Sequence, residues 1–321
     1  MRRVLVTGAG GFIGHHLAGD LATRGEWVRG VDLASPAFEA TRAHEFQLLD
    51  LRRRDACLAA TRDIDEMYAL AANMGGIGYI VSASAEISRD NVLIDTHLLD
   101  AARENGVRRV LYTSSACVYP RYRQGAEDGA PLGEDEAYPA DPEDGYGWEK
   151  LFAERLCRHY REDFGLETRI ARLHNVYGPL GAYAGGREKS PAAICRKVAL
   201  ARDGDAIDVW GDGRQRRSYC YVDDCVEGLR RLMRSDWVEP LNIGQERAVT
   251  IDELVDLVAA VAGKRIEKRY DPSRPQGVRA RASDNRLARR VLGWEPRVAL
   301  EDGLARTYAW IAARLADLAA A

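Results

Sequence analysis

The sequence contains no apolar run that approaches the roughly 18 residues needed to span a bilayer. A strand-like pattern begins at residue 2, with no apolar signal segment before it. These two absences predict a cytoplasmic protein without a membrane partner. The formal net charge is only −3, and lysines and arginines are spread along the chain, so no electrostatic feature indicates a nucleic-acid partner.

Cysteines are few, and their spacing does not suggest a metal site. The six cysteines include no C-x-x-C pair, and none has a histidine at metal-ligand spacing. The pattern therefore indicates neither a zinc site nor a disulfide framework, and no metal is predicted. We expect most of these thiols to be small buried residues.

The composition, with 46% apolar and 30% charged residues, is that of a globular protein. The first half alternates β-branched strand patterns with helical patterns, which is typical of a parallel sheet flanked by helices. After Gly178-Pro179 the alternation loosens and Gly-rich turns separate the elements, which favours a smaller second domain. The predicted strands are 3–7, 27–32, 45–49, 66–71, 110–114 and 169–173, and the predicted helices are 12–24, 92–105, 146–164 and 304–319.

The fold class predicted from this order is α/β, a Rossmann-type doubly wound parallel sheet with a smaller α/β substrate-binding domain. The dinucleotide-binding domain is predicted to span residues 1–175, with a return segment near 217–243. Residues 176–216 and 244–321 are predicted to form the substrate-binding domain.

A glycine-rich segment, Gly8-Ala9-Gly10-Gly11-Phe12-Ile13-Gly14, joins the first predicted strand to the first predicted helix. Glycines let the backbone approach a pyrophosphate, and the helix N-terminus offers it unpaired N–H groups and a partial positive charge. Asp32 ends the second predicted strand, where a carboxylate binds the adenosine ribose and repels the 2′-phosphate of NADP. The cofactor prediction is therefore NAD. The predicted NAD-binding residues are Gly8, Gly11, Phe12, Ile13, Gly14, Asp32, Asp50 and Leu51, with Tyr146 and Lys150.

Several arginines weaken the preference for NAD over NADP, namely Arg29, Arg42 and the run Arg52-Arg53-Arg54. We interpret the run as a solvated face. Asp50 and Leu51 are placed at the end of the third predicted strand, where this fold commonly contacts adenine.

Tyr146 and Lys150 form a Y-x-x-x-K pattern at the start of a predicted helix. A spacing of four places the two side chains on the same helical face, one turn apart. A free tyrosine, with a pKa of about 10, is a poor base at neutral pH, and a nearby ammonium group favours its phenolate form. After a dinucleotide motif, and preceded by Ser114-Ser115 at a strand end, this pattern predicts a catalytic pair.

Together these motifs resemble the extended short-chain dehydrogenase/reductase superfamily over essentially the whole chain. Within it, the sequence is similar to the GDP-mannose 3,5-epimerase family. The Cys117-containing segment and the Gly185-Gly186-Arg187-Glu188-Lys189 segment are the most selective parts of the resemblance. The segments that carry it are 72–76, 114–120, 172–179, 185–191, 210–218 and 277–281.

The resemblance implies epimerisation of GDP-mannose to GDP-L-galactose, GDP-L-gulose or both. Tyr146, assisted by Lys150 and Ser115, would remove the 4-hydroxyl proton of the sugar while NAD takes the C4 hydride. The 4-ketone acidifies C3–H and C5–H, so Cys117 would act as the base on one ring face and Lys189 as the acid on the other. The hydride then returns to C4. The residues implied to bind the GDP-sugar are Gly75, Asn175, Glu188, Lys189, Lys197, Gln215, Arg217 and Arg281.

The resemblance also implies a homodimer, formed through the helices predicted at 92–105 and 146–164. Segments 83–89 and 182–184 depart from the family pattern, which leaves the exact sugar open. Related dehydratases carry a carboxylate at the position of Cys117, so the thiol argues against dehydration.

Three alternatives stay open at this point. They are an epimerase of a related GDP-sugar such as a heptose, a 4-epimerase or dehydratase with the same Tyr–Lys–NAD core, and a non-catalytic sensor that binds a dinucleotide. A sensor would not need Tyr146 or Lys150, and both are present.

Overall fold

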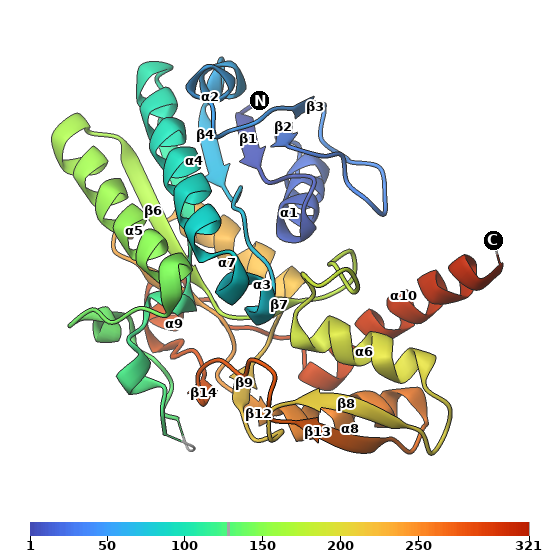
Figure 1. Ribbon diagram of the computed structural model, residues 1–321. Coiled ribbons are helices and arrows are strands. Elements are labelled where there is room, and N and C mark those ends of the chain that lie inside the picture. The colour runs from blue at the N-terminus through green and yellow to red at the C-terminus, as the bar shows by residue number, and fades with distance from the viewer. Residues whose placement is uncertain (127–128, 321) are drawn as a thin grey trace.

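The computed structural model describes residues 1–126 and 129–320. Its centre is a seven-stranded parallel sheet with strand order β11-β6-β5-β4-β1-β2-β3 (Figure 1). The order reverses direction between β1 and β4, which is the doubly wound arrangement predicted from the sequence. The strands are β1 (Arg3–Thr7), β2 (Trp27–Asp32), β3 (Glu45–Leu48), β4 (Glu66–Ala69), β5 (Arg109–Ser115), β6 (Glu167–Leu173) and β11 (Leu241–Ile243).

Helices cover both faces of this sheet because alternate residues of each strand point to opposite sides. In β1, Val4 and Val6 pack into the core on one face, with α1 (Phe12–Thr23) and α7 (Val222–Arg234). Leu5 packs into the core on the other face. The helices on that second face are α2 (Arg54–Thr61), α4 (Ser84–Glu104) and α5 (Asp144–Phe164).

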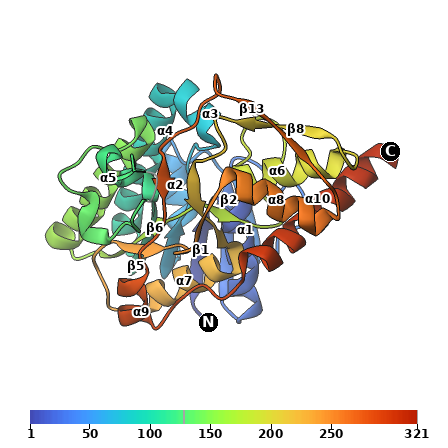
Figure 2. The same cartoon turned by 90° about the horizontal axis from the view of Figure 1, so that it is seen from below.

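A smaller body of helices and short strands lies below the sheet in Figure 1 and to its right in Figure 2. Its helix α10 packs against α6 and α8, as expected for a C-terminal helix that docks on the protein. A capping box starts α8, in which Thr250 and Glu253 satisfy each other's backbone N–H groups. The elements of this body are α6 (Ser190–Leu200), β8 (Ala206–Trp210), α8 (Ile251–Ala262), β13 (Glu267–Asp271) and α10 (Leu300–Ala320).

Short elements connect the two bodies at the edge of the large sheet where its strands have their carboxyl ends. Two small sheets pair β10 with β7, and β12 with β9 and β14. The remaining connecting elements are α3 (Ile77–Ser82), β7 (Val176–Tyr177), β9 (Arg216–Ser218), β10 (Cys220–Tyr221), β12 (Ala248–Thr250), β14 (Ala280–Arg281) and α9 (Arg286–Leu292).

The predicted elements agree with the structure apart from several boundaries. Helix α4 begins at Ser84 rather than residue 92, because Ile87 and Asn91 already turn inward to the core. Strand β3 ends at Leu48, so Asp50 and Leu51 lie just beyond it rather than at its end. The segment 121–145, predicted as loop, contains two single 3₁₀ turns, and residues 127 and 128 of it lie outside the described residues.

The division into two domains stays a prediction.

Within the described residues, no helix has the length and apolar character required to cross a membrane.

Candidate active site

The turn between β1 and α1 brings three stretches of backbone into close contact. Gly8 has a φ of +70°, and a Cβ on Gly14 would lie 2.1 Å from the carbonyl oxygen of Gly8. A Cβ on Gly10 would lie 2.1 Å from the carbonyl oxygen of Ala34. Gly11 is the N-cap of α1 and offers no side chain to bond the first N–H groups of the helix. These donors, with the helix dipole, suit a pyrophosphate.

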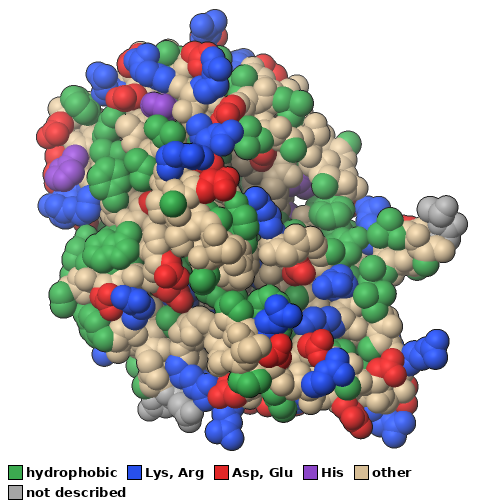
Figure 3. Space-filling model, viewed as in Figure 1, with side chains coloured by type: hydrophobic (Ala, Val, Ile, Leu, Met, Phe, Trp, Pro, Cys, Tyr) green, Lys and Arg blue, Asp and Glu red, His purple; other side chains and the backbone are tan. Residues whose placement is uncertain are grey.

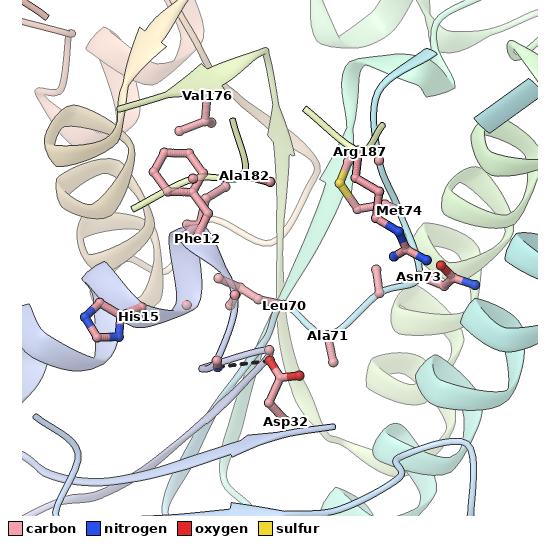
Figure 4. A pocket seen from close by; sticks show the side chains of 18 of the residues that line it. Phe12, His15, Asp32, Leu70, Ala71, Asn73, Met74, Val176, Ala182 and Arg187 are labelled. Carbon is pink, nitrogen blue, oxygen red and sulfur yellow. Dashed lines mark hydrogen bonds between the residues drawn. The ribbon is translucent and has the colours of Figure 1, made fainter. Parts of the chain in front are cut away.

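Asp32 lies at the end of β2, directly beside this turn (Figure 4). One carboxylate oxygen accepts a hydrogen bond from the backbone N–H of Gly10 at 2.9 Å, and the other accepts one from Leu33 at 2.7 Å. The carboxylate is thereby held at the mouth of the cavity, where it suits the ribose hydroxyls of NAD and disfavours a 2′-phosphate.

Two of the arginines that weakened the choice of NAD are committed to other groups. Arg29 is buried and forms an ion pair with Glu45 at 2.9 Å. Arg52 pairs with Asp50 at 2.8 Å and with Asp90 of α4 at 3.2 Å. Arg52 is therefore tied to neighbouring carboxylates, while the side chains of Arg53 and Arg54 are 68% and 50% exposed, in agreement with the solvated face predicted for the run.

A cavity of about 930 Å³ extends from the glycine turn to the start of α5 and into the smaller body. Figure 3 shows the surface hollowed between the two bodies, and Figure 4 shows Asp32 on one side of the cavity and Met74 and Arg187 on another. Its size and its glycine-lined end fit a dinucleotide. The predicted residues that line it are Gly8, Gly11, Phe12, Ile13, Gly14, Asp32, Asp50, Leu51, Gly75, Ser115, Tyr146, Lys150, Asn175 and Lys189.

Tyr146 and Lys150 occupy the first turns of α5, and both are buried. The Lys150 ammonium lies 5.8 Å from the centroid of the Tyr146 ring. Burial raises the pKa of the Tyr146 phenol, while Lys150 and a hydrogen bond with Ser115 act to lower it. The oxygen of Ser115 also accepts the backbone N–H of Cys117 at 3.2 Å, so one serine ties the two predicted catalytic groups together.

Cys117 is the one thiol of the six that is not fully buried. Its sulfur accepts a hydrogen bond from Nη1 of Arg281 at 3.4 Å. Arg281 is in turn held by Glu143 at 2.7 Å and by Gln124 at 2.6 Å. Lys189 lines the cavity close enough to interact electrostatically with Cys117 and Arg281. Burial lowers the pKa of Lys189, which brings its proton exchange closer to neutral pH.

Glu143 and Gln124 were not predicted as site residues. Glu143 lies three residues before Tyr146. No local pattern indicates that it binds Arg281, which lies in β14, 138 positions later in the chain. Gln124 lies in the segment predicted as featureless loop. Both are found only through the long-range contacts of Arg281.

Two arginines, Arg217 and Arg281, lie beside Cys117 and outside the cavity lining. Arg217 donates to the carbonyl oxygen of Val278 at 2.6 Å, and Arg281 lies close to it. Burial and the charge of Arg281 lower the pKa of Arg217 to about 10. Arg281 is buried and Arg217 is partly buried, and two neighbouring guanidinium groups would suit a dianionic diphosphate.

Three further predicted substrate residues also lie outside the cavity lining and bond within the chain. Gln215 is buried and donates to the side-chain oxygen of Gln276 at 3.1 Å. Lys197 donates to a backbone carbonyl of β8 at 2.6 Å. Glu188 accepts the backbone N–H of Gly186 at 2.7 Å. Their roles in binding the substrate stay predictions.

In residues 1–126 and 129–320 there is no group of three or more His, Cys, Asp or Glu side chains that could hold a metal ion. Five of the six cysteines are buried core residues.

Comparison with known proteins defines the class. Residues 4–244 match the family model described as the NAD dependent epimerase/dehydratase family. The chain therefore belongs to this family, which agrees with the predicted superfamily, fold class and NAD cofactor.

Individual relatives narrow the class further. GDP-mannose 3,5-epimerase 1 of Oryza sativa subsp. indica is 45% identical over 315 residues, covering 96% of this chain and 81% of that protein. The crystal structure of a UDP-glucose 4-epimerase with UDP-glucose from Thermotoga maritima has a TM-score of 0.89 at 28% identity, covering 98% of this chain and 99% of that one. A UDP-glucose 4-epimerase from Thermus thermophilus in complex with NAD has a TM-score of 0.85 at 27% identity, covering 96% and 98%.

Proposed function

We propose that this protein is an NAD-dependent epimerase that converts GDP-mannose to GDP-L-galactose, GDP-L-gulose or both. One observation carries the proposal. Lys189 lines the same cavity as Tyr146 and Lys150, and Cys117 lies close enough to interact electrostatically with Lys189 and Tyr146, so the two groups would supply a second pair for proton exchange. A simple 4-epimerase, which inverts only C4, needs only the Tyr–Lys pair. Inversion at C3 and C5 needs a further base and a further acid. The 45% identity to the rice GDP-mannose 3,5-epimerase supports the choice of sugar.

The residues at the glycine turn and Asp32 would hold NAD, which when bound supplies an acceptor for the C4 hydride and returns it. Tyr146 takes the proton of the sugar 4-hydroxyl, and Lys150 favours its phenolate form. Oxidation at C4 acidifies the hydrogens at C3 and C5. Cys117 removes a ring proton from one face, and Lys189 delivers one to the other.

Contacts around the thiol support its role as a base. Nη1 of Arg281 donates to the sulfur of Cys117 at 3.4 Å, so a positive charge lies beside the proposed base. Arg281 and Arg217 together are proposed to bind the diphosphate of the substrate, and Asn175 to contact the sugar. The amide of Asn175 bonds the backbone oxygen of Ser218 at 3.1 Å, with its backbone at a positive φ of 30°.

We further propose that the protein is a homodimer through α4 and α5. These helices pack against each other and leave large apolar side chains on their outer face, namely Leu93, Trp148 and Phe152, which are 37–51% exposed. Apolar side chains gathered on one helical face favour a protein partner. We keep the cytoplasm as the proposed location and the predicted division into two domains as the proposed domain organisation.

The test is proton NMR of GDP-mannose incubated with the protein and NAD in heavy water. Deuterium at C3 and C5 together with new L-sugar signals is the expected result. Exchange at neither centre, with inversion at C4 alone, would replace this proposal with a 4-epimerase. Unchanged GDP-mannose but turnover of another GDP-sugar, such as a heptose, would redirect the substrate and keep the chemistry.

A further inference from the structure

A closed polar cluster lies behind the Tyr146–Lys150 pair, between α4, β5 and α5. It contains Asp95 of α4, Tyr112 of β5, and Glu149 and Lys150 of α5, all of which are at most 4% exposed. The Lys150 ammonium donates to the Tyr112 hydroxyl at 3.0 Å, and that hydroxyl donates to Asp95 at 2.9 Å. These two bonds form a chain of donors that runs from the catalytic lysine to a buried carboxylate.

The cluster contains more carboxyl groups than positive charge. The Lys150 nitrogen lies 3.8 Å from a carboxyl oxygen of Asp95 and 3.8 Å from one of Glu149. Two ionised carboxylates beside one ammonium would leave a buried net negative charge, which a low-dielectric interior disfavours. The cluster therefore favours holding one additional proton.

Hydrogen bonding favours Glu149 as the group that holds this proton. One oxygen of Glu149 accepts from Asn91 at 2.7 Å, but its other oxygen is buried without a hydrogen-bond partner. A protonated carboxyl tolerates such a position better than a carboxylate does. Burial raises the pKa of Glu149 to about 7 and that of Asp95 above its usual value. Cys157 of α5 also faces Asp95, and burial raises the pKa of its thiol, so it stays neutral.

We propose that Asp95 and Tyr112 are positioning residues that store the proton Tyr146 must release to become a base. In this step Lys150 gives a proton to Tyr112, Tyr112 gives its own to Asp95, and Lys150 takes the proton of Tyr146, whose ring centroid lies 5.8 Å from the lysine nitrogen. The products are a Tyr146 phenolate, an unchanged Lys150 ammonium, an unchanged Tyr112 hydroxyl and a neutral Asp95 carboxyl. The number of protons is conserved, and no other reactant is needed.

Burial of the store matters for an epimerase. The proposed reaction oxidises and then re-reduces the same carbon. The proton that leaves O4 therefore returns to O4 in each turnover. Because the carboxyl of Asp95 is at the closed end of the chain, the stored proton is retained beside the site instead of passing to solvent. This inference rests on the proposed function for its catalytic meaning.

The test is the pH dependence of two variants, Asp95→Asn and Tyr112→Phe. Asp95→Asn removes the proton acceptor at the end of the donor chain, and Tyr112→Phe removes the hydroxyl in its middle. Tyr146 should therefore ionise only at higher pH in each variant. The acid limb of the C4 oxidation rate should move to higher pH, with a loss of about tenfold or more at neutral pH. The ultraviolet tyrosinate signal of Tyr146 in the NAD-loaded protein, identified by its loss in Tyr146→Phe, should move the same way.

A simple electrostatic role predicts the opposite sign. Removing a negative charge near Tyr146 would stabilise its phenolate, so the acid limb in Asp95→Asn would move to lower pH. That outcome, or a shift in Asp95→Asn that is absent in Tyr112→Phe, overturns the proposed chain.

A matched control exists on the same two helices. Tyr160 of α5 donates to Asp100 of α4 at 2.6 Å, farther along both helices from Lys150. Asp100→Asn and Tyr160→Phe should change thermal stability to a similar extent as the test variants and leave both pH profiles in place. If the unsubstituted protein does not oxidise GDP-mannose, the proposed function fails, while the tyrosinate titration still decides on the proton store.

Discussion

Replacing Glu143 by Gln should separate the two halves of the proposed reaction. Glu143 holds Arg281 at 2.7 Å, and Arg281 contacts the sulfur of Cys117 at 3.4 Å. Glutamine keeps an oxygen that can accept the hydrogen bond but removes the charge. A hydrogen bond to a charged partner stabilises by about 1.5–3 kcal/mol and a neutral one by about 0.5–1.5 kcal/mol, so the change should cost about 1–1.5 kcal/mol.

That free energy corresponds to about a five- to fifteenfold change in an equilibrium constant. Proton exchange at C3 and C5, which is proposed to depend on Cys117 and Arg281, should therefore slow by about this factor in Glu143→Gln. Oxidation at C4, which is proposed to use Tyr146 and Lys150, should change by less than about twofold. Deuterium incorporation by NMR and NADH absorbance in single-turnover mixing measure the two rates separately.

The control is Glu301→Gln, which removes the charge of an ion pair with Arg247 whose members are both more than 40% exposed. Such surface pairs contribute about 0–1 kcal/mol, so neither rate should change. An equal slowing of both steps in Glu143→Gln would refute the reasoning, because it would mean that Glu143 acts on α5 and Tyr146 instead of through Arg281.

Three further predictions concern the chemistry, the cofactor and the assembly. Cys117→Ala should block ring-proton exchange but still permit NAD reduction, whereas Tyr146→Phe should abolish both, as followed by NMR and NADH absorbance; full epimerase activity in Cys117→Ala would sink the role of the thiol. Gly14→Ala places a Cβ 2.1 Å from the carbonyl oxygen of Gly8, so α1 must move and calorimetry should show NAD affinity reduced by about tenfold or more; unchanged affinity would contradict the pyrophosphate site. Phe152→Glu puts a charge on the exposed apolar face of α5 and should give monomers in light scattering, and a monomeric unsubstituted protein would exclude the proposed dimer.

Features that depend on neighbouring residues could be predicted from the sequence. The strand, glycine turn and helix at residues 3–24, the carboxylate Asp32, and the pair Tyr146 and Lys150 on one helical face all lie where the local patterns place them. Periodicity and turn chemistry act over a few residues, so they appear in a single stretch of sequence. Boundaries were less accurate, as at α4, because the inward-facing residues at its start only become apparent when the core they contact is known.

Contacts between distant segments could not be predicted in this way. Arg281 reaches Cys117 across 164 positions, and Glu143 and Gln124 hold it from two further segments. The pairing of Arg52 with Asp90, 38 positions away, is another contact of this kind.

The sequence by itself determined the class of fold and the cofactor turn, because each depends on short patterns whose physics is local. Only the tertiary structure decided which charges face one another. It placed Asp95 and Tyr112 behind Lys150, and Arg281 against Cys117. Electrostatic effects in a buried site depend on distance and desolvation in three dimensions, and neither quantity can be obtained from the order of residues along the chain.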